Sequence, residues 1–243
     1  MTAPSDPPSA AALPWPPLTA GTLVRRYQRF RADVRLADGR TLTAHCPNTG
    51  RMLGCCEPGR PVYLSHHPRP ERRLPFTWEL IRMPASLVGV NTLVPNRLVA
   101  AAAHAGAIPE LSGYSEVRRE VRLAPGTRID LELVRPGGER CLVEVKNCTL
   151  VEDGAALFPD AVTARGRRHL EELAQRVGPG SRSVIFFLVQ RMDAERFRPA
   201  AAIDPHYAAA LQAAAAQGVE VLAYDAHIDL TALRLRRRLP VEI

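Results

Sequence analysis

Residues 128–150, RIDLELVRPGGERCLVEVKNCTL, contain two short stretches of alternating apolar and polar side chains, joined by the turn-forming triplet Pro-Gly-Gly. This pattern predicts two half-buried strands that pair as an antiparallel hairpin. Asp130 lies near the start of the first strand, and Glu144 and Lys146 lie inside the second. Because successive side chains on a strand point to opposite faces, Glu144 and Lys146 share a face. We expect the antiparallel partner to bring Asp130 beside them.

The composition of the whole chain is that of a soluble protein, with 243 residues, 46% hydrophobic and 23% charged. This length is enough for two small domains or one large one. No apolar run approaches the roughly 18 to 20 residues of a membrane helix, and the first residues lack a basic start followed by an apolar stretch. We therefore predict a cytoplasmic protein without a membrane partner, in which the Pro-rich residues 1–19 form a disordered arm.

The five cysteines are odd in number and show no Cys-x-x-Cys spacing. This favours reduced thiols over a disulfide framework or a zinc ribbon. A metal cluster formed by His45, Cys46, Cys55 and Cys56 is the weaker alternative, because the spacing does not match that of zinc sites.

Positive charge is concentrated in a few segments of a chain whose net charge is +7 and whose pI is about 9.6. The basic residues gather in residues 24–35, 66–73, 163–169 and 234–240. Arginines hold phosphates and aromatic faces stack on bases, so the first cluster predicts largely non-specific binding of DNA by Arg25, Arg26, Tyr27, Arg29 and Phe30. For any single cluster, a solvated basic surface is the favoured alternative.

Residues 22–82 consist of short alternating stretches separated by turns such as ADG, NTG and PGR. This pattern predicts a small antiparallel barrel over residues 20–85. The loop that carries Asn48 and Arg51 offers backbone donors and a guanidinium group to a phosphate. A tight turn between two strands is an equally good explanation of the same residues.

The pattern changes in residues 86–243, where helices and strands follow in the order helix, three strands, helix, strand, helix, strand, so the fold class is α+β. The predicted helices cover residues 97–107, 163–177 and 203–218, and Asp204 is the expected N-cap of the third helix. Thr163 is the expected N-cap of the second, whose start offers a phosphate site with Arg165, Arg167 and Arg168. We interpret His169 as a residue of the helix face, and Glu120 as a strand-face charge rather than an additional metal ligand.

The order of elements in this second domain resembles the PD-(D/E)xK nuclease core, in which an acid on one strand and an acid-x-Lys on the next form the site. Here these positions are Asp130, Glu144 and Lys146. Two carboxylates are suitable ligands for Mg²⁺ or Mn²⁺, and a lysine orients or helps to deprotonate the attacking water. Lys146 is the only lysine of the chain, and arginine does not replace lysine in such a role because it stays protonated.

The alternative explanation is a cross-strand ion pair on a solvated hairpin, worth less than about 1 kcal/mol. An Asp…Glu-x-Lys pattern is loose when taken alone. The order of the elements and the single lysine favour the metal site.

Long blocks of the sequence resemble the sugar fermentation stimulation protein family, SfsA, among them RRYQRFRADVRLADGRTLTAHCPNTGRM, VNTLVPNRLV, EVKNCTL and FPDAVTARGRRHL. The resemblance covers about residues 20–240. It implies an N-terminal OB-fold, a PD-(D/E)xK nuclease-like domain over residues 86–243, non-specific DNA binding and a regulatory role in sugar (maltose) metabolism. The family's nuclease-like positions correspond to Asp130, Glu144 and Lys146.

The sequence thus predicts a DNA-binding protein with a Mg²⁺-dependent (or Mn²⁺-dependent) phosphodiesterase site, catalytic residues Asp130, Glu144 and Lys146, and metal ligands Asp130 and Glu144. The alternative is a DNA-binding regulator of sugar-metabolism genes that keeps the nuclease fold without turnover. A sugar-processing enzyme is disfavoured because no paired-carboxylate cleft with aromatic platforms is apparent. The oligomeric state stays open, with a homodimer as one option.

Overall fold

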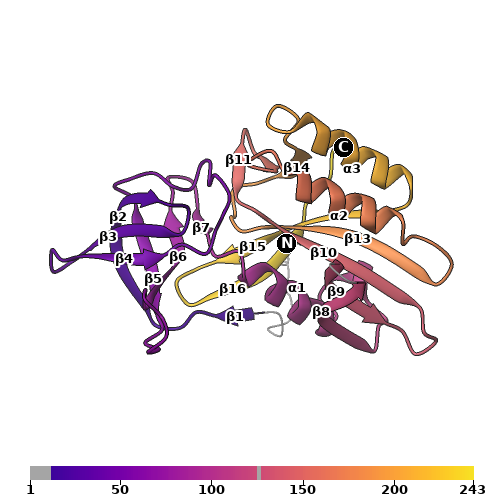
Figure 1. Cartoon of the computed structure of the whole chain (residues 1–243), viewed down its shortest axis with the longest axis horizontal. Coiled ribbons are helices and arrows are strands. Elements are labelled where there is room, and N and C mark those ends of the chain that lie inside the picture. The colour runs from indigo at the N-terminus through magenta and orange to yellow at the C-terminus, as the bar shows by residue number, and fades with distance from the viewer. Residues whose placement is uncertain (1–11, 125–126) are drawn as a thin grey trace, which may run out of the picture.

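The computed structural model of the chain describes residues 12–124 and 127–243. Its N-terminal part is a small barrel, drawn in indigo and purple in Figure 1. The strands follow the order β4-β3-β2-β5-β6-β7, and β4 also pairs with β6, which closes the barrel. Their bounds are β2 (Leu18–Tyr27), β3 (Arg31–Leu36), β4 (Thr41–His45), β5 (Pro61–His66), β6 (Phe76–Arg82) and β7 (Leu87–Gly89).

Alternating side chains of these strands fill the barrel, as the sequence pattern predicts. The core contains Leu23, Val34, Leu64 and Trp78, each with at most 1% of its surface exposed. The predicted OB-like barrel is therefore confirmed.

The C-terminal part is built on a sheet of seven strands in the order β1-β16-β15-β13-β10-β9-β8. The central strands β10, β13 and β15 run parallel, and β9 and β16 pair with them in the antiparallel sense. Their bounds are β1 (Ala12–Pro14), β8 (Glu116–Ala124), β9 (Thr127–Val134), β10 (Arg140–Cys148), β13 (Ser181–Val189), β15 (Glu220–Ile228) and β16 (Ala232–Arg238). A second sheet contains β11 (Leu150–Glu152), β12 (Ala155–Phe158) and β14 (Arg196–Pro199).

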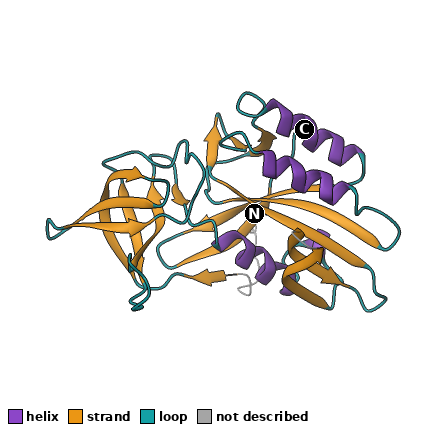
Figure 2. Cartoon of the chain, in the orientation of Figure 1, coloured by secondary structure: helices purple, strands orange, loops and turns teal. Residues whose placement is uncertain are grey.

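Helices cover both faces of the large sheet (Figures 1 and 2). Helix α1 (Val94–His104) lies on one face, followed by the short 3-10 turn η2 (Pro109–Leu111), and α2 (Ala164–Ala174) and α3 (Pro205–Ala216) lie on the other. The predicted N-caps are confirmed, because the Thr163 hydroxyl accepts from Gly166 N and the Asp204 carboxylate accepts from Tyr207 N. The α+β fold class is thus confirmed.

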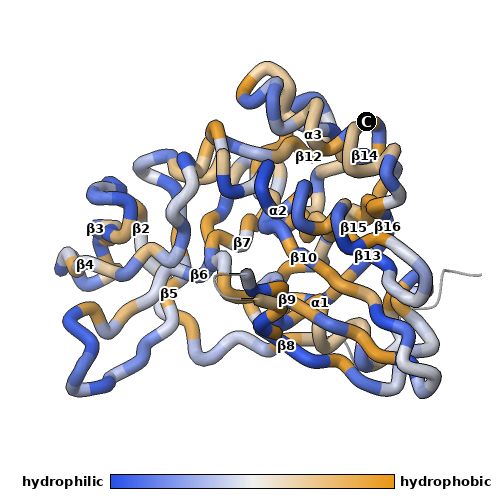
Figure 3. Tube along the Cα trace, turned by 45° about the vertical axis from the view of Figure 1, so that its right-hand side comes forward, coloured by the Kyte–Doolittle hydropathy of each residue, from blue (hydrophilic) through white to orange (hydrophobic). Residues whose placement is uncertain are grey.

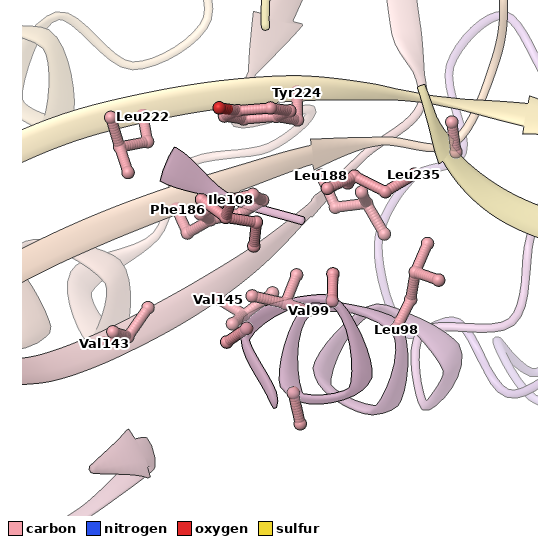
Figure 4. Packing of buried hydrophobic residues seen from close by; sticks show 14 of the residues in the cluster. Leu98, Val99, Ile108, Val143, Val145, Phe186, Leu188, Leu222, Tyr224 and Leu235 are labelled. Atoms are coloured by element: carbon pink, nitrogen blue, oxygen red, sulfur yellow. The ribbon is translucent and has the colours of Figure 1, made fainter. Parts of the chain in front are cut away.

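Two apolar clusters hold these layers together. Leu98 and Val99 of α1 pack on Val143, Val145 and their neighbours, as Figure 4 shows. The opposite face buries Leu142, Ile185 and Phe187 under α2 and α3. Hydrophobic segments accordingly run through β9 and β10 in Figure 3. Because β10 alternates strictly, its apolar residues are divided between the two clusters, and this alternation sets the direction of Glu144 and Lys146.

The N-terminal segment corrects the prediction of a disordered arm over residues 1–19. Residues 12–14 form β1, which pairs antiparallel with β16, and the Trp15 indole N–H donates to the Asp229 carbonyl at 3.0 Å. Leu13 and Trp15 pack against the core, and proline is tolerated because β1 is an edge strand. Composition alone did not reveal this edge pairing. Residues 1–11 lie outside the described part of the chain.

Several further features bear on the sequence predictions. Besides β1, five strands were not anticipated, namely β7, β11, β12, β14 and β16. All five cysteines are free thiols, and Cys56 alone is not buried. None of the helices within the described ranges is long and apolar enough to cross a membrane.

Candidate active site

The site forms where the hairpin of β9 and β10 opens. The backbone pairing of β9 with β10 ends at Leu131 and Val143. Beyond this pair, the side chain of Asp130, rather than a backbone carbonyl of β9, accepts the hydrogen bond from β10. Its Oδ2 accepts from the backbone N–H of Val145 at 2.8 Å, and its Oδ1 accepts from Nδ2 of Asn96 on α1 at 2.7 Å. Both oxygens of Asp130 are therefore held by neutral donors, and no arginine or lysine forms an ion pair with it within the described residues.

Glu144 and Lys146 share the face of β10 that looks toward α2. Lys146 Nζ donates to Glu144 Oε1 at 2.7 Å and lies 3.2 Å from Nδ1 of His169. His169 Nδ1 also contacts Glu144 Oε1 directly, and its other ring nitrogen accepts from Arg165 Nε at 3.2 Å. The side chain of Glu144 is only 6% exposed, so this small network is screened from solvent.

Burial and repulsion set the protonation of the two acids. Burial, and then the nearby charge of Glu144, raise the pKa of Asp130 to about 6. Burial also opposes the ionisation of Glu144, but the hydrogen bond from His169 and the charge of Lys146 outweigh it and lower its pKa. The two carboxylates are thus close enough to repel each other. The charge of Lys146 acts on both, but within the described residues only Glu144 forms an ion pair with it.

A polar pocket of about 420 Å³ opens over both carboxylates. Arginines form most of its rim, so it combines an acidic floor with a basic edge. The lining residues include Arg122, Arg128, Arg165, Arg168 and His169. The structure brings the predicted Arg165 and Arg168 to this pocket. Arg167 lies elsewhere, 3.5 Å from the buried carboxylate of Asp204.

The first basic cluster lies on β2 and the turn that follows it. Arg25 is largely exposed, forms an ion pair with Asp33 at 2.8 Å, and lies over the ring of Tyr27. At the tip, Arg29 has a positive φ of 61° and the side chain of Phe30 is 48% exposed. The tip therefore presents a guanidinium group and an aromatic ring to solvent.

Arg26 and Asn48 have structural contacts instead. Arg26 Nη2 donates to the carbonyls of Arg29, Asn48 and Gly50, which ties the β2–β3 turn to the next loop. Asn48 is 4% exposed, and its amide donates to Val90 O and accepts from Gly50 N. These two predicted DNA contacts are therefore occupied inside the barrel.

The same loop connects the two parts of the molecule. Asp160, in the segment before α2, accepts from the backbone N–H of Met52 at 2.7 Å. A Cβ at Gly50 would meet the Asp160 carboxylate at 2.8 Å, so a larger residue there requires a shift. Arg51 is exposed beside this junction. The barrel loop and the start of α2 consequently lie side by side.

The basic stretch at residues 234–240 is neutralised by acids of the fold. Arg236 and Arg237 both contact the fully buried Asp225, Arg234 contacts Asp229, and Arg238 contacts Glu110. The arginines of this cluster therefore form ion pairs within the fold.

Two residues of the site were not expected from the sequence. Asn96 has no local signal, because α1 reaches Asp130 only through the packing of the layers. His169 was interpreted as a helix-face residue, and the structure corrects this by placing its ring against Glu144 and Lys146. Glu120 forms an ion pair with Arg128 at 2.9 Å, has a positive φ of 55°, and its charge raises the pKa of Asp130.

The donors suit a hard divalent cation. Within the described ranges, no three His, Cys, Asp or Glu residues converge as a complete metal cage, and this includes the alternative at His45 and Cys46. Mg²⁺ is commonly held by one or two carboxylates together with water and substrate phosphates. Asp130 and Glu144 fit this description, since their mutual repulsion is relieved by a cation between them.

Comparisons with known proteins agree with this architecture. Residues 24–90 match the model of the SfsA N-terminal OB domain, and residues 93–232 match the sugar fermentation stimulation protein RE domain. A sugar fermentation stimulation protein homolog of Geobacter sulfurreducens is 55% identical over 225 residues, covering 93% of this chain and 96% of that protein. A homolog of Halorhodospira halophila is 56% identical over 229 residues, covering 92% and 95%. The structure of Pyrococcus furiosus SfsA in complex with Ca²⁺ superimposes with a TM-score of 0.86 at 28% identity, covering 95% of this chain and 98% of that one.

Proposed function

The chain belongs to the sugar fermentation stimulation protein family, and from this membership and the geometry of its site we propose that it binds DNA and hydrolyses phosphodiester bonds with a divalent metal. The observation that carries the proposal is the meeting of Asp130 and Glu144 in one pocket with an arginine rim, where Lys146 donates to Glu144. A purely structural ion pair does not need a second, half-buried carboxylate whose pKa is raised to about 6.

Asp130 and Glu144 would hold the metal, Mg²⁺ or Mn²⁺. When bound there, the metal supplies Lewis acidity and lowers the pKa of a coordinated water. The Pyrococcus furiosus SfsA structure is a complex with Ca²⁺, a cation of the same oxygen-ligand class, which supports a divalent site in this chain.

Lys146 would orient the attacking water or take up its proton, because its amine already lies beside Glu144 in a largely buried position. Asn96 and the backbone N–H of Val145 hold the carboxylate of Asp130 in place. His169 contacts the same oxygen of Glu144 as Lys146 does and, with Arg165, forms the edge on which a phosphate would rest.

DNA would approach across the junction of the two parts. Arg29, Phe30 and Arg51 are exposed on the barrel, and Arg165 and Arg168 are exposed at the start of α2. The bond between Met52 and Asp160 keeps these groups on neighbouring loops. Arginines hold backbone phosphates without reading sequence, so we expect largely non-specific binding.

A second candidate is a DNA-binding regulator of sugar-metabolism genes that does not turn over. It is favoured by the ion pair between Lys146 and Glu144, which satisfies both groups without a metal. Binding alone requires the arginines but not the two acids.

The deciding experiment is a cleavage assay on single- and double-stranded DNA with Mg²⁺ or Mn²⁺. We expect metal-dependent cleavage by the wild-type protein, and its loss in Glu144→Gln, with DNA binding retained. As a matched control, Glu139→Gln removes an exposed acid that pairs with Arg135 and should leave cleavage unchanged. If the pure wild-type protein cleaves no DNA with either metal, the nuclease proposal is wrong and the DNA-binding regulator is the remaining candidate.

A further inference from the structure

A second pocket, of about 230 Å³, lies where the N-terminal segment, the barrel and α1 meet. It shares no lining residue with the pocket over Asp130 and Glu144. Its walls combine apolar side chains, among them Trp15 and Leu93, with the guanidinium groups of Arg72 and Arg97. The proposed cleavage site uses none of these groups.

Neither arginine of this pocket forms an ion pair with an acid in the described part of the chain. Arg97 is exposed and forms no ion pair with any residue in the described ranges, and Arg72 donates to the hydroxyl of Thr77 at 2.9 Å. The single acid among the lining residues is Glu79, which is 4% exposed. Its two oxygens accept from the Ser65 hydroxyl at 2.6 Å and from the Asn91 amide at 2.8 Å. Its single charge can offset only one of the two arginines.

The electrostatic field in the pocket is consequently positive. Burial lowers the pKa of His45, and the charge of Arg72 lowers it further, by more than Glu79 raises it. Helix α1 also begins here, at Val94, and has no acidic residue in its first turn. The start of a helix carries partial positive charge, which adds to that of the arginines.

We propose that this pocket binds a phosphomonoester attached to a flat, partly apolar body. Guanidinium groups bind phosphate through charge-assisted hydrogen bonds, and an indole offers an aromatic surface to a base. Both a free nucleoside monophosphate and the 5′-phosphorylated end of a DNA strand have this chemistry. The strand end rests on the proposed function, whereas the free nucleotide does not.

The first test is titration calorimetry of the full chain with AMP, adenosine and inorganic phosphate in a buffer with chelator. Trp15 fluorescence provides a second signal, since the other tryptophan, Trp78, is fully buried in the barrel. We expect AMP to bind at least about tenfold more tightly than adenosine. Arg97→Ala and Arg72→Ala should each weaken AMP binding by about tenfold.

The matched control is Arg35→Ala, which removes an exposed barrel arginine outside the pocket and should leave AMP binding unchanged. Thermal melting verifies that each variant is folded. Measurable AMP binding that is no tighter than adenosine binding, or that survives both pocket substitutions, overturns the proposal.

The strand-end source is tested with one short oligonucleotide carrying either a 5′-phosphate or a 5′-hydroxyl. A preference for the phosphorylated form that disappears in Arg97→Ala, without AMP binding, assigns the pocket to a strand end. Absence of both AMP binding and the 5′-phosphate preference overturns the site. Because neither readout involves cleavage, failure here leaves the proposed nuclease function intact, and failure of cleavage leaves this test valid.

Discussion

The seven-stranded sheet contains two acids, one fully buried and one half-buried, whose charges are matched in opposite ways. Asp225 on β15 is fully buried, and its carboxylate receives Arg236 at 2.5 Å and Arg237 at 3.2 Å. Asp130 on β9 receives only the amide of Asn96 and the N–H of Val145. Arginines are present near Asp130 as well, but they line the rim of its pocket.

This difference indicates that Asp225 stabilises the fold, whereas Asp130 is available to a ligand. A buried charge matched by cations and hydrogen bonds is stable, and removal of one partner is costly. A half-buried acid next to a second acid, without an ion pair of its own, lowers the stability of the fold when it is ionised and no cation is bound. The sheet therefore has a neutralised end at β15 and β16, and an open end at β9 and β10.

The largest expected effect is on the neutralised end. Asp225→Ala leaves two guanidinium groups without their buried partner, so it should lower the free energy of unfolding by about 3–5 kcal/mol. Urea denaturation measures this. Asp38→Ala, which breaks the exposed pair with Arg40, should cost less than about 1 kcal/mol. A small loss in Asp225→Ala would remove the contrast between the two ends.

The next effect concerns the lysine of the open end. Lys146→Arg keeps the charge but replaces the compact amine, and should lower the cleavage rate by about a hundredfold or more. Rates are compared at matched folding, verified by thermal melting. Arg135→Lys makes the reverse exchange in an exposed pair and should leave the rate unchanged. Equal rates for Lys146→Arg and wild type would contradict a catalytic role of the amine.

Asp130→Asn should stabilise the metal-free protein near pH 7.5, while it abolishes cleavage. The folded state binds a proton more tightly than the unfolded state, because the pKa of Asp130 is raised to about 6. Wild-type stability therefore falls as pH rises from about 4 to about 6, by on the order of 2–3 kcal/mol. The variant lacks this fall. Urea denaturation with chelator, at both ends of this pH range, measures the free energy of unfolding of wild type and variant. A wild-type protein whose free energy of unfolding does not fall over this range would contradict the prediction.

The smallest effect concerns DNA affinity. Arg29→Ala combined with Arg51→Ala should weaken binding about tenfold and reduce the slope of log affinity against log salt by about 2. Fluorescence anisotropy over a salt series measures both quantities. Arg40→Ala, whose guanidinium already pairs with Asp38, is the control. Salt-independent binding would contradict phosphate recognition by these arginines.

The sequence alone determined the features that depend on neighbours along the chain. Strand alternation put Glu144 and Lys146 on one face of β10, and the Pro-Gly-Gly turn brought Asp130 opposite them. The caps at Thr163 and Asp204 were equally readable, because an N-cap bonds to a backbone N–H three residues later. The barrel followed from the spacing of its turns.

Only the tertiary structure decided which charges are neutralised. The arginines of residues 234–240 and those of α2 have similar sequence patterns, yet the register of β15 with β16 places the former on Asp225, Asp229 or next to Glu110. Asn96 and His169 reach the site from helices on opposite faces of the sheet. Likewise, β1 became ordered because β16 offers it an edge. Such contacts join distant parts of the chain through packing, which a local pattern does not encode.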